Sequence, residues 1–83
     1  MATANRIAVV GIVVMDRGNA ARKVNEILSE YGDIIVGRMG IPYKERGISV
    51  ISLIIDATTD EIGALTGKLG NIKNVKVKSA FTI

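Results

Sequence analysis

This sequence contains no cysteine, no histidine and no tryptophan among its 83 residues. Without cysteine there is no disulfide and no thiol nucleophile, and without both residue types there is no zinc-finger ligand set and no imidazole base. Proline occurs once and hydrophobic residues make up 48% of the chain, which excludes a disordered composition. A domain this short buries only about 60% of its unfolded surface. We therefore expect copies of the chain to stabilise one another.

Long apolar runs and a strong charge of either sign are also missing. The longest strand candidate, Ile7 to Val14, falls well short of the ~20 residues that span a bilayer, and no signal-peptide cleavage pattern follows it. The net charge is only +3, and the basic residues are spread along the chain. Such a small surplus is typical of a soluble surface. We expect a cytoplasmic protein with no membrane partner.

The residues that are present predict a strand–helix–strand unit that occurs twice. The expected strands are 7–14, 33–39, 48–57 and a last one beginning at 75, with helices at 20–31 and from 59, and a loop at 40–47. Asp16 or Asn19 is expected to cap the first helix, and Gly32 to end it. Thr58 and Glu61 form a capping-box pattern before the second helix.

The two units also align with each other. Ile7 and Ile48, and likewise Val24 and Leu65, lie 41 residues apart. Two such units give a βαββαβ chain of the α+β class, a ferredoxin-like sandwich with two helices on one face of a four-stranded antiparallel sheet. We expect residues 1–5 to form an N-terminal tail and residues 6–83 a single domain.

In that topology the first and third strands are central, and both are apolar at odd and even positions alike. Val9 and Val13 alternate with Val10 and Ile12, for example. The helices cover only one face, so the other would expose apolar side chains to water, contrary to the habit of antiparallel sheets. Exposed apolar patches of this kind mark interfaces. The sequence therefore predicts a dimer or tetramer formed through the sheet face or a sheet edge.

Two glycines lie inside the second helix, at positions 63 and 67. Each costs about 1 kcal/mol relative to alanine, and residues four apart share one helix face. Gly63 and Gly67 thus form a smooth strip that another backbone or a ligand can approach. The alternative interpretation of these glycines is close packing of this helix against its own sheet or a neighbouring subunit.

Five segments together resemble a known bacterial family. They are Val14-Met-Asp-Arg17, Val24-Asn-Glu-Ile-Leu28, Gly37-Arg-Met-Gly-Ile-Pro42, Ile62-Gly-Ala-Leu-Thr-Gly-Lys-Leu-Gly70 and Val75-Lys-Val-Lys78. From about residue 6 to 82 the chain resembles the iron-only hydrogenase system regulators, which have ACT-like domains. The resemblance implies a fold similar to the C-terminal domain of the nickel-responsive repressor, which assembles as a tetramer. It also implies a link to hydrogenase maturation or expression.

Two features of that repressor are not expected here. Its nickel site uses histidines and a cysteine, and this chain has neither. Its DNA-binding domain would not fit in the five residues that precede the first strand. We expect no metal and no cofactor.

The resemblance also implies a ligand site, because ACT-like domains often bind small molecules between subunits near the turn after the first strand. Here that turn is Met15, Asp16, Arg17, Gly18 and Asn19. Arg17 could pair with a carboxylate or phosphate, although plain helix capping explains the same residues. Arg38, between two glycines at a strand end, is a further candidate for an ion pair between subunits or a ligand carboxylate.

No arrangement of carboxylates suggests catalysis, and the arginine-bearing phosphate loop of acylphosphatases has no counterpart, so we expect no enzyme. The leading hypothesis is a homo-oligomeric regulatory module that binds a small metabolite between subunits. The second is an interaction scaffold without a ligand. Direct nucleic-acid binding through Lys76 and Lys78 comes third, because no aromatic residues accompany them for base stacking.

Overall fold

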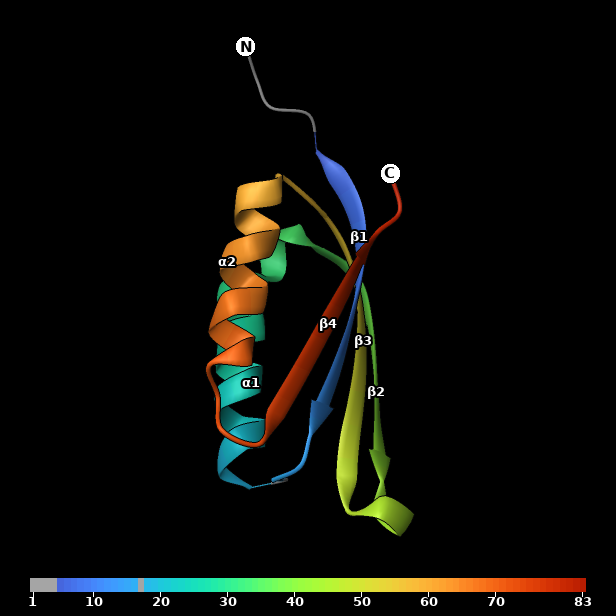
Figure 1. Ribbon diagram of the computed structural model, residues 1–83, viewed down its shortest axis with the longest axis vertical. Helices are drawn as coiled ribbons and strands as arrows, with labels where there is room; N and C mark the ends of the chain where they lie inside the picture. The colour runs from blue at the N-terminus through green and yellow to red at the C-terminus, as the bar shows by residue number, and fades with distance from the viewer. Residues whose placement is uncertain (1–4, 17) are drawn as a thin grey trace.

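The protein forms a four-stranded antiparallel sheet with both helices on one face (Figure 1). The computed structural model describes residues 5–16 and 18–83, so residues 1–4 of the expected tail and Arg17 lie outside it. The strand order β2-β3-β1-β4 places β1 and β3 in the centre, and the ferredoxin-like βαββαβ fold is confirmed. The elements are β1 (Arg6–Val14), α1 (Asn19–Glu30), η1 (Gly32–Ile34), β2 (Ile35–Tyr43), η2 (Lys44–Arg46), β3 (Ile48–Ala57), α2 (Thr59–Gly70) and β4 (Val75–Phe81).

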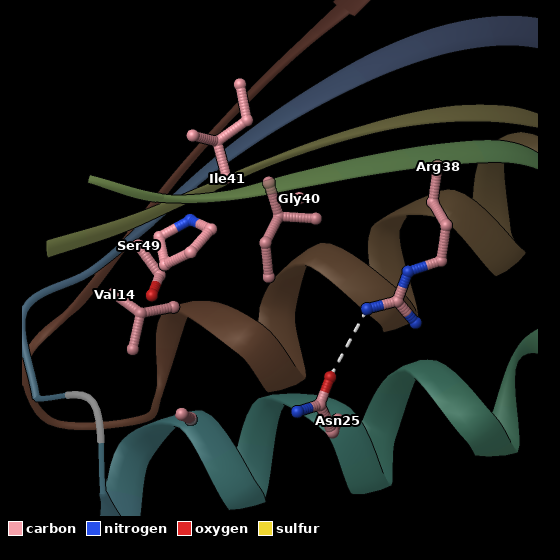
Figure 2. A pocket seen from close by; sticks show the side chains of 9 residues that line it. Val14, Asn25, Arg38, Gly40, Ile41 and Ser49 are labelled. Carbon is pink, nitrogen blue, oxygen red and sulfur yellow. Dashed lines mark hydrogen bonds between the residues drawn. The ribbon is translucent and has the colours of Figure 1, made fainter. Parts of the chain in front are cut away.

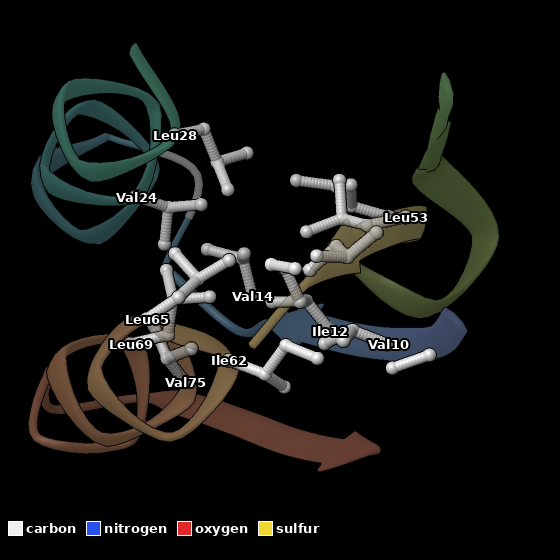
Figure 3. Packing of buried hydrophobic residues seen from close by; sticks show 14 of the residues in the cluster. Val10, Ile12, Val14, Val24, Leu28, Leu53, Ile62, Leu65, Leu69 and Val75 are labelled. Carbon is white, nitrogen blue, oxygen red and sulfur yellow. The ribbon is translucent and has the colours of Figure 1, made fainter. Parts of the chain in front are cut away.

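The core lies between the two layers, where side chains of the sheet and of both helices meet (Figure 3). Val10 and Leu53 from the central strands are fully buried, and so are Val24 of α1 and Leu65 of α2. Within the described residues no polar or charged side chain is buried. Burying one such apolar side chain contributes about 1.5–3 kcal/mol, so this layer holds the helices on the sheet. In the same part of the chain, no helix is long and apolar enough to cross a membrane.

One of the two helices has the N-terminal cap that the sequence predicts, and the other does not. Before α2, the Glu61 amide donates to Thr58 Oγ1 at 3.2 Å and the Thr58 amide donates to Glu61 Oε1 at 3.0 Å, which confirms the capping box. Before α1, no side chain of the described residues caps the helix. The prediction that Asp16 or Asn19 would do so is wrong: Asp16 Oδ1 accepts from the Gly18 amide, two residues on, and Asn19 is already the first helical residue.

The second strand is longer than its sequence predicts. β2 continues to Tyr43 in register with β3, so the expected loop at 40–47 shrinks to η2 and Gly47, which has a φ of +66°. Pro42 does not end the strand because β2 is an edge strand, where a missing N–H costs no ladder hydrogen bond. At the other end of this strand, Gly32 and Asp33 belong to η1, and α1 ends at Glu30 before Gly32 is reached.

The face of the sheet opposite the helices is apolar, as the alternation in both central strands predicts. We call it the open face; from the strand registers it carries Ile7, Val9, Gly11 and Val13 of β1, Ile48, Val50, Ser52, Ile54 and Asp56 of β3, Gly37, Met39, Ile41 and Tyr43 of β2, and Lys76, Lys78 and Ala80 of β4. Met39 is 65% exposed, Ile41 54% and Ile54 46%. No described element covers this face, which Figure 1 shows as the bare side of the sheet.

Candidate functional site

A hollow of about 190 Å³ lies between α1 and the outer strand β2 (Figure 2). Its lining combines an apolar floor with a few polar groups at the rim. The lining residues are Val14, Ala21, Asn25, Arg38, Gly40, Ile41, Pro42, Ser49 and Ile51. Ligand sites in proteins are commonly mostly apolar, with a small number of placed polar groups. The hollow is smaller than a drug-sized site, and it suits a molecule of about the size of an amino acid.

A bulge in β2 directs Arg38 to this hollow. The register shifts between Ile35 and Gly37, so the exposed Val36 is an extra residue that has no partner on β3. Such an extra residue reverses which face the following side chains occupy. Arg38 consequently pairs with the inward-facing Leu53 and lies on the helix side, whereas regular alternation from Ile35 would have placed it on the open face.

Among the described residues, the Arg38 guanidinium has one hydrogen-bond partner, and this partner is neutral. Its Nη2 donates to Asn25 Oδ1 of α1 at 3.3 Å, as the dashed line in Figure 2 shows. Among the residues that the structure describes, no carboxylate forms an ion pair with it. A guanidinium has five N–H donors in a planar fork that matches a carboxylate. Arg38 therefore keeps donors available at the rim of the hollow for an anionic group.

The predicted turn after β1 lies on another side of α1. Asp16 and Asn19 line a separate hollow of about 140 Å³ with Lys23 and with residues of the α2–β4 connection. The structure therefore does not bring this turn and Arg38 together within one chain. Arg17, the charged member of the predicted turn, lies outside the described residues.

Local contacts already occupy the polar groups of this turn. Asp16 Oδ1 accepts from the Gly18 amide at 3.0 Å, and Asn19 Oδ1 accepts from Arg22 Nη2 at 2.8 Å. The Met15 amide donates to the Asn74 carbonyl at 2.8 Å, which fixes the turn to the start of β4. These contacts fit a structural turn at the helix start, and a ligand role for Met15 to Asn19 stays a prediction.

The two helix glycines face away from the sheet. A Cβ added at Gly63 or Gly67 would meet no atom within 4 Å among the described residues. Packing of this strip on the chain's own sheet is therefore absent from the described structure. Close approach by another copy or by a ligand stays a prediction for Gly63 and Gly67.

Sequence reasoning missed two polar residues of the α1–β2 hollow, Asn25 and Ser49. Ser49 carries a signal, because it holds an inward position of a strand whose next inward residues are Ile51 and Leu53. A polar residue at such a position marks a place where the core gives way to a polar rim. Asn25 follows Ala21 by one helical turn on the side of α1 that faces β2. As for metals, no group of acidic side chains suited to bind an ion occurs in the described ranges.

Comparison with known proteins finds one family model, which matches residues 6–79 and is described as TM1266-like, "Iron-only hydrogenase system regulator, putative". A solved structure of the uncharacterized protein TM1266 from Thermotoga maritima is 40% identical. The match covers 95% of this chain and 99% of that one, with a TM-score of 0.93. A search of curated proteins finds no match.

More distant structures share the fold. The ACT domain of GTP pyrophosphokinase from Chlorobium tepidum is 22% identical over 93% of this chain and 100% of that one, with a TM-score of 0.78. An ACT domain protein from Streptococcus pneumoniae is 17% identical over 95% of this chain and 91% of that one, with a TM-score of 0.62. At these identities the likeness shows an ACT-like fold and nothing further.

Proposed function

This chain belongs to the TM1266-like family of iron-only hydrogenase system regulators, and from that premise we propose that it is a non-catalytic, ligand-responsive regulatory module. In this proposal the chain forms a homo-oligomer and binds a small metabolite with a carboxylate group in the α1–β2 hollow. The regulated process is the maturation or expression of an iron-only hydrogenase. The cytoplasmic location expected from the sequence stays a prediction.

The observation that carries the proposal is Arg38 at the rim of the hollow. Its partner within the chain is a neutral amide at 3.3 Å, while the floor beside it is formed by Val14, Ala21 and Ile51. A ligand carboxylate would form two charge-assisted hydrogen bonds with the guanidinium, which are about twice as strong as neutral ones. A short aliphatic group on the same ligand would cover the apolar floor. Amino acids and small oxo or hydroxy acids have this combination.

Strand β2 borders both the hollow and the open face, so it can couple ligand binding to the association of copies. Arg38, Gly40 and Ile41 line the hollow. By strand register Met39 and Ile41, which alternate with Arg38 and Gly40, lie on the open face. A ligand that orders β2 from one side therefore changes the surface offered to another copy on the other side. Such coupling is reciprocal, so assembly would also tighten ligand binding.

A thermal-shift assay tests the ligand part. The purified protein is heated with a panel of free amino acids and short oxo and hydroxy acids, each alone at excess. A ligand that binds only the folded state raises Tm, since stabilisation grows with the ratio of ligand concentration to Kd. We expect one chemical group of the panel to stabilise the wild type, and Arg38→Gln to lose that shift.

Arg46→Gln is the matched control, because Arg46 is an exposed arginine in η2 at the hairpin tip, outside the lining of the hollow. It should keep the full shift. If no compound stabilises the wild type, or if Arg38→Gln responds as the wild type does, the ligand site is wrong. The interaction scaffold without ligand then becomes the better account.

A further inference from the structure

We propose that two copies of this chain pack with their open faces against each other, so that the bare sides of the two sheets form a second apolar core. This inference rests on the homo-oligomer of the proposed function and identifies the surface through which it forms. It does not depend on the identity of the ligand.

The centre of the open face is almost entirely apolar. Along the central strands, the open-face positions from Ile7 to Val13 and from Ile48 to Asp56 hold two polar side chains, Ser52 and, near the end of β3, Asp56. The neighbouring edge strand adds Met39, Ile41 and Tyr43, all exposed. Antiparallel sheets that face water normally carry polar residues at these positions. A contiguous apolar patch of this kind is typical of an interface.

The size of the face fits a stable pair of identical chains. Four strands about 4.8 Å apart and about nine residues long at about 3.3 Å per residue give a face of roughly 19 by 30 Å, or roughly 570 Å². Two such faces bury at least roughly 1,100 Å², since protruding side chains expose more area than the flat projection. Specific protein interfaces bury about 1,200–2,000 Å² in total. The open face is therefore just large enough for one copy of itself.

The open face is not flat, because its central row of side chains is short. Gly11 and Ser52 are paired across the central strands and form a low row. On one side of this row lies the pair Val9 and Ile54, and on the other side the pair Val13 and Val50. A Cβ at Gly11 would meet nothing within 4 Å among the described residues. A hollow of about 240 Å³ lies beside the row and is lined by Gly37, Arg38, Met39, Ser52 and Ile54.

Packed sheets interdigitate side chains across a gap of about 10 Å. We infer that branched side chains of one copy enter the low row of the other. A two-fold axis makes the contact reciprocal, because an isologous interface is self-complementary.

The charged residues of this face lie at its margins, where they suit the rim of an interface. Lys76 and Lys78 are on the edge strand β4, and Asp56 lies near one end of β3. Lysine stems can cover apolar surface while the ammonium groups reach water. The centre of the face contains no charge that pairing would desolvate.

The test compares two carboxylate substitutions by sedimentation equilibrium over a wide range of protein concentration. Ile54→Glu places a charge in the centre of the open face, and Ala64→Glu places the same charge on the exposed outer side of α2. We expect Ile54→Glu to raise the dissociation constant at least about 30-fold, as for a central interface residue, and Ala64→Glu to leave it unchanged. Ile54→Thr, which keeps a β-branched side chain, serves if the glutamate variant fails to fold.

Each outcome is decisive for this surface. Equal association of folded Ile54→Glu or Ile54→Thr and the wild type would overturn the pairing of open faces and leave the ligand proposal standing. If only Ala64→Glu weakens association, the contact lies on the glycine strip of α2, and the pairing of open faces is overturned as well. A wild type that is monomeric at every concentration would contradict both this inference and the homo-oligomer on which it rests.

Discussion

Replacing Gly11 by valine should stabilise the fold of the single chain and weaken the association of two copies through their open faces. Gly11 lies in the middle of β1, between Ser52 of β3 and Lys78 of β4. Glycine inside a strand costs about 0.5–1 kcal/mol relative to alanine, and valine is among the residues that strands favour. A Cβ at this position has no atom within 4 Å in the described chain, so no clash offsets the gain. We expect the free energy of unfolding to rise by about 1 kcal/mol, or Tm by about 4–8 °C.

The same side chain fills the low row that the partner's side chains are inferred to enter. Because sheets pack about 10 Å apart with interdigitated side chains, the added methyl groups hold the two faces apart. We expect the dissociation constant to rise at least about tenfold, which corresponds to about 1.4 kcal/mol. Opposite signs for folding and association distinguish a filled interface from a general loss of structure.

Urea unfolding at protein concentrations below the dissociation constant measures the change in the free energy of unfolding. Sedimentation equilibrium measures the change in association. Gly32→Ala is the control, because it should also stabilise the chain, by about 0.4–1 kcal/mol, without changing association; Gly32 is exposed in η1, away from the open face and from the glycine strip of α2, and a Cβ there meets no described atom within 4 Å. A Gly11→Val variant that associates as tightly as the wild type would refute the inferred contact at this row.

Three further predictions concern the fold. Leu65→Ala removes a fully buried side chain of α2 and should lower the free energy of unfolding by about 2–5 kcal/mol; a loss below about 1 kcal/mol in urea would contradict the described core. Thr58→Ala removes the cap of α2 and should cost about 1 kcal/mol, whereas Thr59→Ala, next to it, should cost less. The Thr58 amide and then its hydroxyl, both donating to the carboxylate, lower the pKa of Glu61 from its usual 4.5. The stabilisation from the ionised Glu61 carboxylate is therefore fully present above pH 4.5 and is lost as the pH falls through the lowered pKa. Glu61→Gln should flatten the dependence of Tm on pH in this range. An unchanged dependence would show that the carboxylate is not held by the cap.

The sequence predicts the fold because its local signals agree with each other. The apolar strands, the capping box at Thr58 and Glu61 and the 41-residue internal repeat all indicate the same βαββαβ chain, and each is present in the structure. The apolar open face follows from residue alternation alone, because the sheet period of two is strict in β1 and β3.

The predictions that fail concern segments whose local structure is decided by pairing with residues distant in the sequence. Gly40 and Pro42 predict a loop, yet their partners Ile51 and Ser49 hold them in β2. The bulge at Val36 has no signal strong enough to predict, and it determines that Arg38 lies beside α1. Asn25 and Ser49 join Arg38 only through the tertiary fold, so a site composed of three separate elements could not be read from spacing along the chain.

We propose that this family member is an assembled module which holds a small acidic metabolite beside Arg38. Native mass spectrometry of the protein purified in gentle buffer reads the assembly size and any retained mass together. We predict a dimer or tetramer that carries a discrete additional mass, which Arg38→Gln loses while Arg46→Gln keeps it. A monomer, or an oligomer whose retained mass is the same in all three proteins, would contradict this proposal.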